Sequence, residues 1–191
     1  MLRILACFLI LVIQITAFSQ NKVYTTKKIN PTVPAIDGKL TDDCWKHADW
    51  DGNFIQFEPY ENGPPGQKTS FAILYDDDNL YVAIKAYDSV PEKINRRLSR
   101  RDDDDGDWVG IVIDSYEDKK TGFSFSVTAA GSKMDQIFTN DTDEDDSWDP
   151  IWYVKTSVDD EGWNAEMKIP LSQLRFTKKP RYEWGLEVAR Y

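Results

Sequence analysis

The chain has 191 residues and a formal net charge of −10, from 33 acidic and 23 basic residues. This acidic excess excludes the broad basic surface that nucleic-acid binding requires. Residues 1–19 have the features of a secretory signal peptide: Arg3 precedes an apolar run from Ile4 to Ile15, and Ala17-Phe18-Ser19 is a typical cleavage sequence. The apolar run is short for a membrane span. We therefore predict an exported protein (periplasmic, outer-membrane associated or extracellular) whose residues 20–191 form one domain.

Cysteine and histidine are scarce in the expected mature chain. Cys7 lies within the signal, so Cys44 alone remains and an internal disulfide is excluded. Cys44 and His47 have a metal-like spacing, but His47 is the only histidine of the chain. Zinc sites usually need three or four such ligands. We interpret Cys44 and His47 as structural residues.

The first part of the mature chain predicts two strands and a short helix. Lys22 to Ile29 has the composition of an edge strand. Thr41 is a candidate cap for a helix that places Trp45 on the core side. Gly52 to Phe57 is expected to form a further strand.

The clearest local signal is a β-hairpin. Residues 68–75 alternate between larger and smaller side chains, residues 76–79 supply turn formers, and residues 80–87 return with the composition of a strand. Residues 92–101 are expected to hold a helical turn rich in arginine.

The segment Asp107–Asp114 predicts an inner strand, because apolar residues stand at both parities and both faces should therefore be covered. Residues 123–129 alternate strictly, which indicates a strand with one apolar face, and residues 131–139 form a further expected strand.

The last third of the chain continues the same pattern. Residues 151–158 and 163–169 predict a second hairpin, residues 171–174 a short helical turn, and residues 183–190 a final strand. Short strands at regular spacing predict an all-β fold. We expect an antiparallel β-sandwich, immunoglobulin-like or jelly-roll-like, with one or two short helices.

Four segments, in this order, are similar to the family 9 carbohydrate-binding modules of bacterial xylanases. They are Ile36-Asp37-Gly38-Lys39-Leu40 with Trp45, Leu74 to Asp88, Asp107 to Asp114, and Gly162-Trp163-Asn164-Ala165-Glu166 with Ile169-Pro170. Two further features, Trp148 to Trp152 and Leu174-Arg175-Phe176, more closely resemble an uncharacterised bacterial subfamily in which the domain precedes an outer-membrane β-barrel. The ending at Tyr191 would suit the front part of such a protein.

The resemblance implies a β-sandwich that binds calcium and holds sugar ends between tryptophans. Within the third segment, Asp107 and Asp114 match the family pattern. Gly110 stands where the family usually has a glutamate of the ligand region. That departure puts sugar binding in question and keeps an acidic or calcium-binding role open.

Flat aromatic faces and a few directed polar groups are what sugar binding needs in water. Trp45, Trp163 and Trp184 fall within the periodic core pattern and are assigned to packing. The remaining tryptophans of interest lie beside loops. The candidate platform residues are Trp50, Trp108, Trp148 and Trp152.

Two acidic loops are candidates for calcium, which takes several hard oxygen ligands at once. Residues 140–149 superficially resemble a calcium loop but fail as an EF-hand, since Asp146 stands where glycine is needed and Trp152 where a bidentate glutamate belongs. If the two loops meet in space, the ligands would be Asp104, Asp105, Asp107, Asp143 and Asp145. The commoner alternative for such runs is a solvated acidic loop.

Catalysis has no support in the sequence. A glycosidase needs two carboxylates held across the scissile bond, and nothing marks one pair among 33 acids. No serine lies in a nucleophile-elbow pattern. The chain is therefore predicted not to be an enzyme, although it would suit an ancillary module of a glycoside hydrolase such as a xylanase.

Two hypotheses of different class remain. The first, from the resemblance, is an exported non-catalytic module that binds poly- or oligosaccharide through loop tryptophans, with structural calcium. The second is an accessory or interaction domain, without a sugar site, in front of an outer-membrane β-barrel. Gly110 favours the second and the tryptophans beside acidic loops favour the first. The expected partners are a carbohydrate and a following barrel or catalytic domain.

Overall fold

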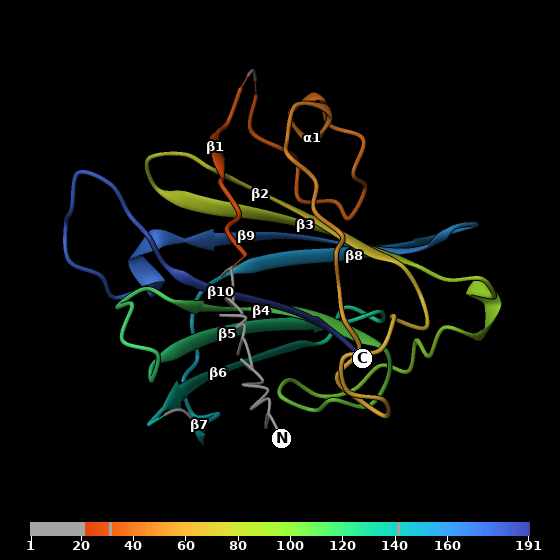
Figure 1. Ribbon diagram of the computed structural model, residues 1–191. Helices are drawn as coiled ribbons and strands as arrows, with labels where there is room; N and C mark the ends of the chain where they lie inside the picture. Colours follow the sequence, from red (N-terminus) through yellow and green to blue (C-terminus); the bar gives the residue numbers. More distant parts are fainter. Residues whose placement is uncertain (1–21, 31, 141) are drawn as a thin grey trace, which may run out of the picture.

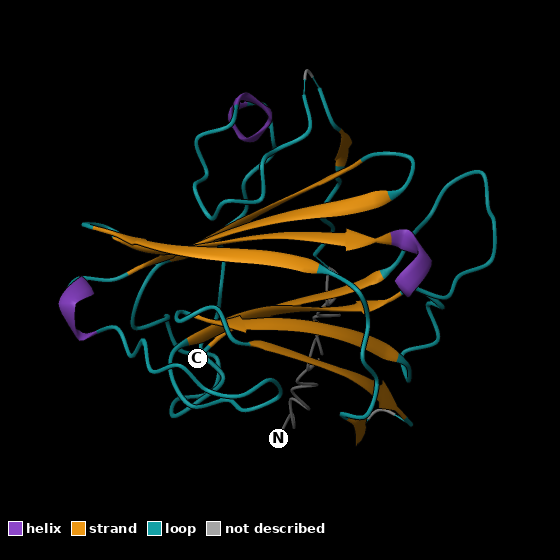
Figure 2. Cartoon of the chain, turned by 180° about the vertical axis from the view of Figure 1, so that it is seen from behind, coloured by secondary structure: helices purple, strands orange, loops and turns teal. Residues whose placement is uncertain are grey.

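Two five-stranded β-sheets pack face to face and form the body of the protein (Figures 1 and 2). The computed structural model describes residues 22–30, 32–140 and 142–191; the predicted signal peptide lies outside them. The sandwich and its short helices confirm the predicted fold class. Within the described residues, no helix is long and apolar enough to cross a membrane.

The first sheet has the order β1-β2-β3-β9-β8. Its strands are β1 (Lys27–Lys28), β2 (Thr69–Tyr75), β3 (Asn79–Tyr87), β9 (Gly162–Pro170) and β8 (Tyr153–Asp159). The predicted hairpins 68–87 and 151–169 are confirmed as β2-β3 and β8-β9. The predicted first strand is an edge strand, but it is only two residues long and runs parallel to β2.

The second sheet has the order β10-β4-β5-β6-β7. Its strands are β10 (Gly185–Arg190), β4 (Trp108–Asp114), β5 (Gly122–Thr128), β6 (Lys133–Thr139) and β7 (Asp143–Asp145). β4 lies between β10 and β5, which confirms the prediction that it is an inner strand. All pairings in this sheet are antiparallel.

Alternate side chains of β4 face the core between the sheets. Val109, Ile111 and Ile113 are at most 3% exposed and share one apolar cluster with residues from both sheets. Each such buried aliphatic side chain stabilises the fold by about 1.5–3 kcal/mol. Trp108 and Val112, of the opposite parity, are only partly buried, so the outer face of β4 is less covered than the sequence pattern predicts.

A smaller apolar cluster covers part of the outer face of the first sheet. The helix α1 (Asp43–Lys46) lies on this face (Figure 1) and buries Cys44 and Trp45 against it. Burial raises the pKa of the Cys44 thiol to about 11. Both residues therefore pack as structural residues.

One buried carboxylate ties this segment to the sheet. Glu166 of β9 accepts hydrogen bonds from Trp45 Nε1 at 2.8 Å, Asp37 N at 3.0 Å and Gly38 N at 3.1 Å. Burial raises the pKa of Glu166, and these three hydrogen bonds oppose the rise. A buried acceptor shared by three donors fixes the position of the segment above the sheet.

Three local predictions are wrong. Residues 52–57 form no strand: Asp51 and Gln56 make only isolated bridges, and Ile55 is 70% exposed, because no neighbouring strand continues the ladder. The helix α1 begins after Asp42 rather than Thr41. The expected helical turn at 92–101 is limited to η1 (Pro91–Lys93). The other predicted turn is confirmed as η2 (Leu171–Gln173).

Candidate functional site

A cleft of about 660 Å³ lies where β4 begins, beside the C-terminal residue. It contains four of the residues predicted from the sequence, one tryptophan and three acids. Its lining is Asn95, Asp104, Asp105, Gly106, Asp107, Trp108 and Tyr191, which together we call the β4 cleft.

An aromatic pair forms one wall of the β4 cleft. Trp108 N donates to Tyr191 O at 3.1 Å and Tyr191 N donates to Trp108 O at 2.9 Å, so the two residues lie directly opposite each other. Their rings are nearly parallel, with 6.1 Å between centroids and 14° between planes. Tyr191 is 77% exposed, which leaves an aromatic surface open to a ligand.

The acidic wall depends on a tight turn of the backbone. Gly106 has φ +127°, and a Cβ there would lie 3.0 Å from Asn95 O, so a side chain is disfavoured on both counts. Asp107 N donates to the same carbonyl at 3.4 Å. Asp105 forms an ion pair with Arg97 at 3.1 Å. The turn thus brings Asp104, Asp105 and Asp107 into the lining of the same cleft as the aromatic pair.

Asp107 has the most perturbed environment in the β4 cleft. Burial raises its pKa, and the Asn95 backbone and the Arg190 charge oppose that rise. Arg190 is itself largely buried: its guanidinium donates to Tyr87 O at 2.6 Å and lies 3.4 Å from the Asp88 carboxylate. Burial lowers the pKa of Arg190. This arginine therefore links the ends of the two sheets next to the cleft.

Gly110 shares the outer face of β4 with Trp108. A Cβ at Gly110 would lie 2.0 Å from Ser126 Oγ and 2.8 Å from Ser126 Cβ, because Ser126 stands directly opposite on β5. The serine side chain occupies the volume that a side chain at 110 would need. The glutamate expected from the family pattern is thus absent, and its place is filled.

Two of the four predicted platform tryptophans are packing residues. Trp152 is 1% exposed and donates from Nε1 to Asp135 Oδ2 at 3.0 Å, so its prediction as a sugar platform is wrong. Trp148 is partly buried against the core, with its ring 5.3 Å from Phe123 and 5.5 Å from Phe125. Tryptophans beside an acidic loop look alike in sequence, whichever way their rings point.

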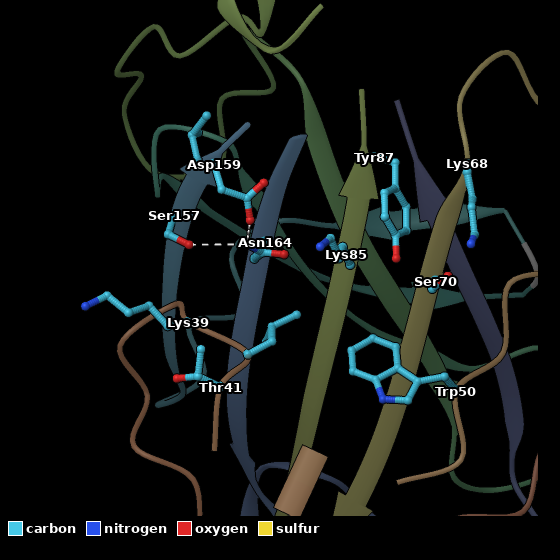
Figure 3. Close-up of a pocket in the computed structure, with 12 residues that line it drawn as sticks. Lys39, Thr41, Trp50, Lys68, Ser70, Lys85, Tyr87, Ser157, Asp159 and Asn164 are labelled. Carbon is cyan, nitrogen blue, oxygen red and sulfur yellow. Dashed lines mark hydrogen bonds between the residues drawn. The ribbon is translucent and has the colours of Figure 1, made fainter. Parts of the chain in front are cut away.

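Trp50 is 40% exposed and lies away from the β4 cleft, in a groove on the outer face of the first sheet (Figure 3). Its Nε1 donates to Trp45 O at 3.0 Å, which fixes the indole. Of the assigned packing tryptophans, Trp45 and Trp163 are fully buried and Trp184 packs against the core.

The two acidic loops do not meet. Asp143 lies opposite Thr139, at the end of β6. Trp108 lies opposite Thr128, at the end of β5, and this end of β5 adjoins the start of β6. The carboxylates near residue 143 and those near residue 107 therefore lie at opposite ends of the second sheet. The five-residue calcium set is wrong for this reason.

No group of three or more His, Cys, Asp or Glu side chains within the described residues is placed to hold a metal ion. Asp145 accepts from Ser147 N at 3.0 Å, and Asp143 accepts from Asn140 Nδ2 at 3.0 Å. Asp114 accepts backbone N–H groups of the following turn, at 2.7 Å from Glu117 N. These acids act as turn formers.

Sequence reasoning missed Tyr191 and Arg190. Both follow or end the last strand, and their place beside the start of β4 depends on the β10-β4 register, in which Arg190 pairs with Val109. The sequence offered one signal for Tyr191, an aromatic residue directly after the predicted last strand.

Comparison with known proteins agrees with the observed fold. Residues 36–191 match the family model described as carbohydrate family 9 binding domain-like. A family 9 carbohydrate-binding module from Caldicellulosiruptor kristjanssonii in complex with glucose has 24% identity, covers 85% of this chain and 76% of its own, and superposes with a TM-score of 0.59. A family 9 module from the same organism, in complex with cellotriose, has 23% identity, coverage of 85% and 73%, and a TM-score of 0.57.

A third structure has the same fold. A Bacteroides uniformis protein proposed to bind carbohydrate has 14% identity, covers 78% of this chain and 72% of its own, and gives a TM-score of 0.58. No curated protein sequence matches the chain.

Proposed function

Because the chain belongs to the carbohydrate family 9 binding domain-like family, we propose that it binds a neutral poly- or oligosaccharide in the β4 cleft. The observation that carries this proposal is the parallel pair of Trp108 and Tyr191 beside several carboxylates. The similar modules of C. kristjanssonii hold glucose and cellotriose. Short β-glucans are therefore the first ligands to test.

The chemistry of the β4 cleft suits a pyranose. The C–H face of a sugar ring packs on the Trp108 and Tyr191 rings, and apolar contact of this kind supplies most of the binding free energy. Asp104 and Asp105 accept hydrogen bonds from sugar hydroxyls, and Asn95 both donates and accepts. The acids keep the cleft anionic, which favours neutral over acidic sugars.

The proposal is one of binding without catalysis, in keeping with a family of binding domains. Export remains part of it, supported by the signal-like residues 1–19. The proposal also includes attachment to a further barrel or catalytic domain. Its support is that the segments Trp148–Trp152 and Leu174–Phe176 resemble the subfamily in which the domain precedes a barrel.

Calorimetric titration with cellotriose and with glucose tests the proposal. We expect saturable binding, with cellotriose tighter, and a loss of about tenfold in affinity in Trp108→Ala and in Tyr191→Ala. Tyr153→Ala is the matched control, since Tyr153 is 53% exposed on β8, outside the cleft. No binding of either sugar, or equal binding by wild type and Trp108→Ala, would overturn the proposal and leave an accessory domain without a sugar site.

A further inference from the structure

A second recess, of about 710 Å³, lies on the outer face of the first sheet and shares no lining residue with the β4 cleft. Strand pairing places Ser70, Lys85, Asn164 and Ser157 in one row across β2, β3, β9 and β8. This row forms the floor where the segment carrying α1 leaves the sheet uncovered (Figure 3). We call the whole recess the lysine groove. The lining residues used in the argument below are Trp50, Lys68, Lys85, Tyr87, Asp159 and Asn164.

The lysine groove has an excess of positive charge in an acidic protein, because Lys39, Lys68 and Lys85 line it and Asp159 is the one acidic residue among the lining residues. Lys68 and Lys85 place their ammonium groups 4.8 Å and 4.9 Å from the centre of the Tyr87 ring, and Lys39 lines the same groove. Lys85 forms an ion pair with Glu161 at the rim. Neither Lys39 nor Lys68 has an ion-pair partner within the part of the chain that the structure describes. In a chain of net charge −10, this local field selects an anionic ligand.

An aromatic platform stands beside these charges. Trp50 is 40% exposed, and its hydrogen bond to Trp45 O holds the indole in one orientation. Figure 3 shows Trp50 and Asp159 at opposite corners of the floor, with Lys85 and Asn164 between them. A fixed, exposed indole beside a polar floor is the arrangement on which a sugar ring stacks.

Asn164, in the floor of the groove, has one polar atom without a partner. It is 6% exposed, and its Nδ2 donates to Asp159 Oδ2 at 2.9 Å and to Ser157 Oγ at 3.4 Å. Its Oδ1 is buried and has no hydrogen-bond partner. Buried polar atoms without a partner are uncommon in folded proteins. Because Oδ1 is covered, a ligand hydroxyl would reach it only after a small shift of the Asn164 amide.

We propose that the lysine groove binds an acidic saccharide, a uronate-containing oligosaccharide whose ring stacks on Trp50 and whose carboxylates pair with the ammonium groups of Lys68 and Lys85, which flank the Tyr87 ring (Figure 3). A simple inorganic anion would leave the exposed Trp50 indole unused. A neutral sugar would leave Lys68 without an ionic partner, whereas Lys85 already has Glu161. The inference goes beyond the proposed function, because it concerns a different face of the protein and a different class of sugar.

Titration with trigalacturonate, cellotriose and inorganic phosphate tests this second site. The wild type is expected to bind trigalacturonate, and the affinity should fall as salt is added, because the contacts are ionic. Trp108→Ala should bind cellotriose about tenfold more weakly and trigalacturonate as the wild type does, which separates failure of one site from failure of the other. Phosphate binding as tight as that of trigalacturonate would overturn the proposal in favour of a plain anion site.

Variants locate the binding. The double variant Lys68→Gln/Lys85→Gln should weaken trigalacturonate binding by about tenfold or more. Lys168→Gln is the matched control, since the Lys168 ammonium also lies over a tyrosine ring, that of Tyr153 at 5.8 Å, outside the groove. It should bind like the wild type.

Trp50→Ala should lose binding and Trp50→Phe should recover part of it, because phenylalanine keeps a stacking face without the Nε1 hydrogen bond. Undiminished trigalacturonate binding in the lysine double variant would overturn the proposal. Circular dichroism checks whether Trp50→Ala is folded. If it is not, the lysine double variant alone decides the test.

Discussion

Replacing Gly110 with alanine isolates the contact that explains the missing family glutamate. The new Cβ would lie 2.0 Å from Ser126 Oγ and 2.8 Å from Ser126 Cβ. The hydroxyl can rotate away, but the Cβ is fixed to the backbone of β5, so the strands must separate by several tenths of an ångström. Overpacking of this kind costs about 1–3 kcal/mol. For a domain of this size, we expect Gly110→Ala to lower the melting temperature by about 3–9 °C.

The partner substitution supplies the control. Ser126→Gly removes the opposing atoms and should cost about 0.5–1 kcal/mol on its own, because glycine weakens a strand. In the double variant Gly110→Ala/Ser126→Gly the steric cost disappears. The cycle should therefore show a favourable coupling of about 1–2 kcal/mol between the two positions.

Urea unfolding of all four proteins, followed by tryptophan fluorescence, measures this coupling. Additive effects of the two substitutions would refute the steric explanation. A Gly110→Ala variant as stable as the wild type would refute it as well, because Ser126 would then not fill the position.

Four further predictions concern stability and calcium. Glu166→Ala should reduce the free energy of unfolding by about 2–4 kcal/mol, because three donors lose one buried acceptor. Burial raises the pKa of Glu166 above its usual 4.5, so the folded state binds the proton more tightly than the unfolded state, and wild-type stability should fall as pH rises from 4.5 through the raised value. Urea titrations at several pH values should show that Glu166→Gln lacks this dependence. Equal pH profiles of the two proteins would contradict the assignment. Arg190→Ala should lower the free energy of unfolding by about 2–3 kcal/mol, because the Asp88 carboxylate and the Tyr87 carbonyl lose their buried partner. Thermal or urea unfolding measures this change. An unchanged stability would show that water replaces the guanidinium. Added calcium should leave the melting temperature within about 1 °C, because the predicted acids lie at two ends of a sheet; a rise that grows with calcium concentration would contradict this.

Strand periodicity predicted most of the fold because it is a local property. The alternation in 68–87 and the apolar run in 107–114 each carry their own signal, and both became strands at nearly the expected bounds. Residues 52–57 show the limit of that reasoning. The segment has a strand-like composition, but a strand exists only with a partner, and the chain offers it none beyond isolated bridges.

The candidate site was only partly predictable, because it depends on how distant segments meet. Trp108 and Asp107 are neighbours in sequence, so their shared location followed from the chain itself. Trp152 could be separated from Trp50 only by knowing that Asp135 accepts its Nε1 in the core. Tyr191 joins the site only through the register of β10 on β4.

The most direct test of sugar binding in the β4 cleft is an NMR titration with cellotriose that follows the tryptophan indole N–H signals. The chain has seven tryptophans, and Trp108 alone among them lines the cleft. We expect the Trp108 signal to shift saturably, while those of the buried Trp152 and Trp163 stay in place. An unchanged Trp108 signal at saturating cellotriose would contradict the account.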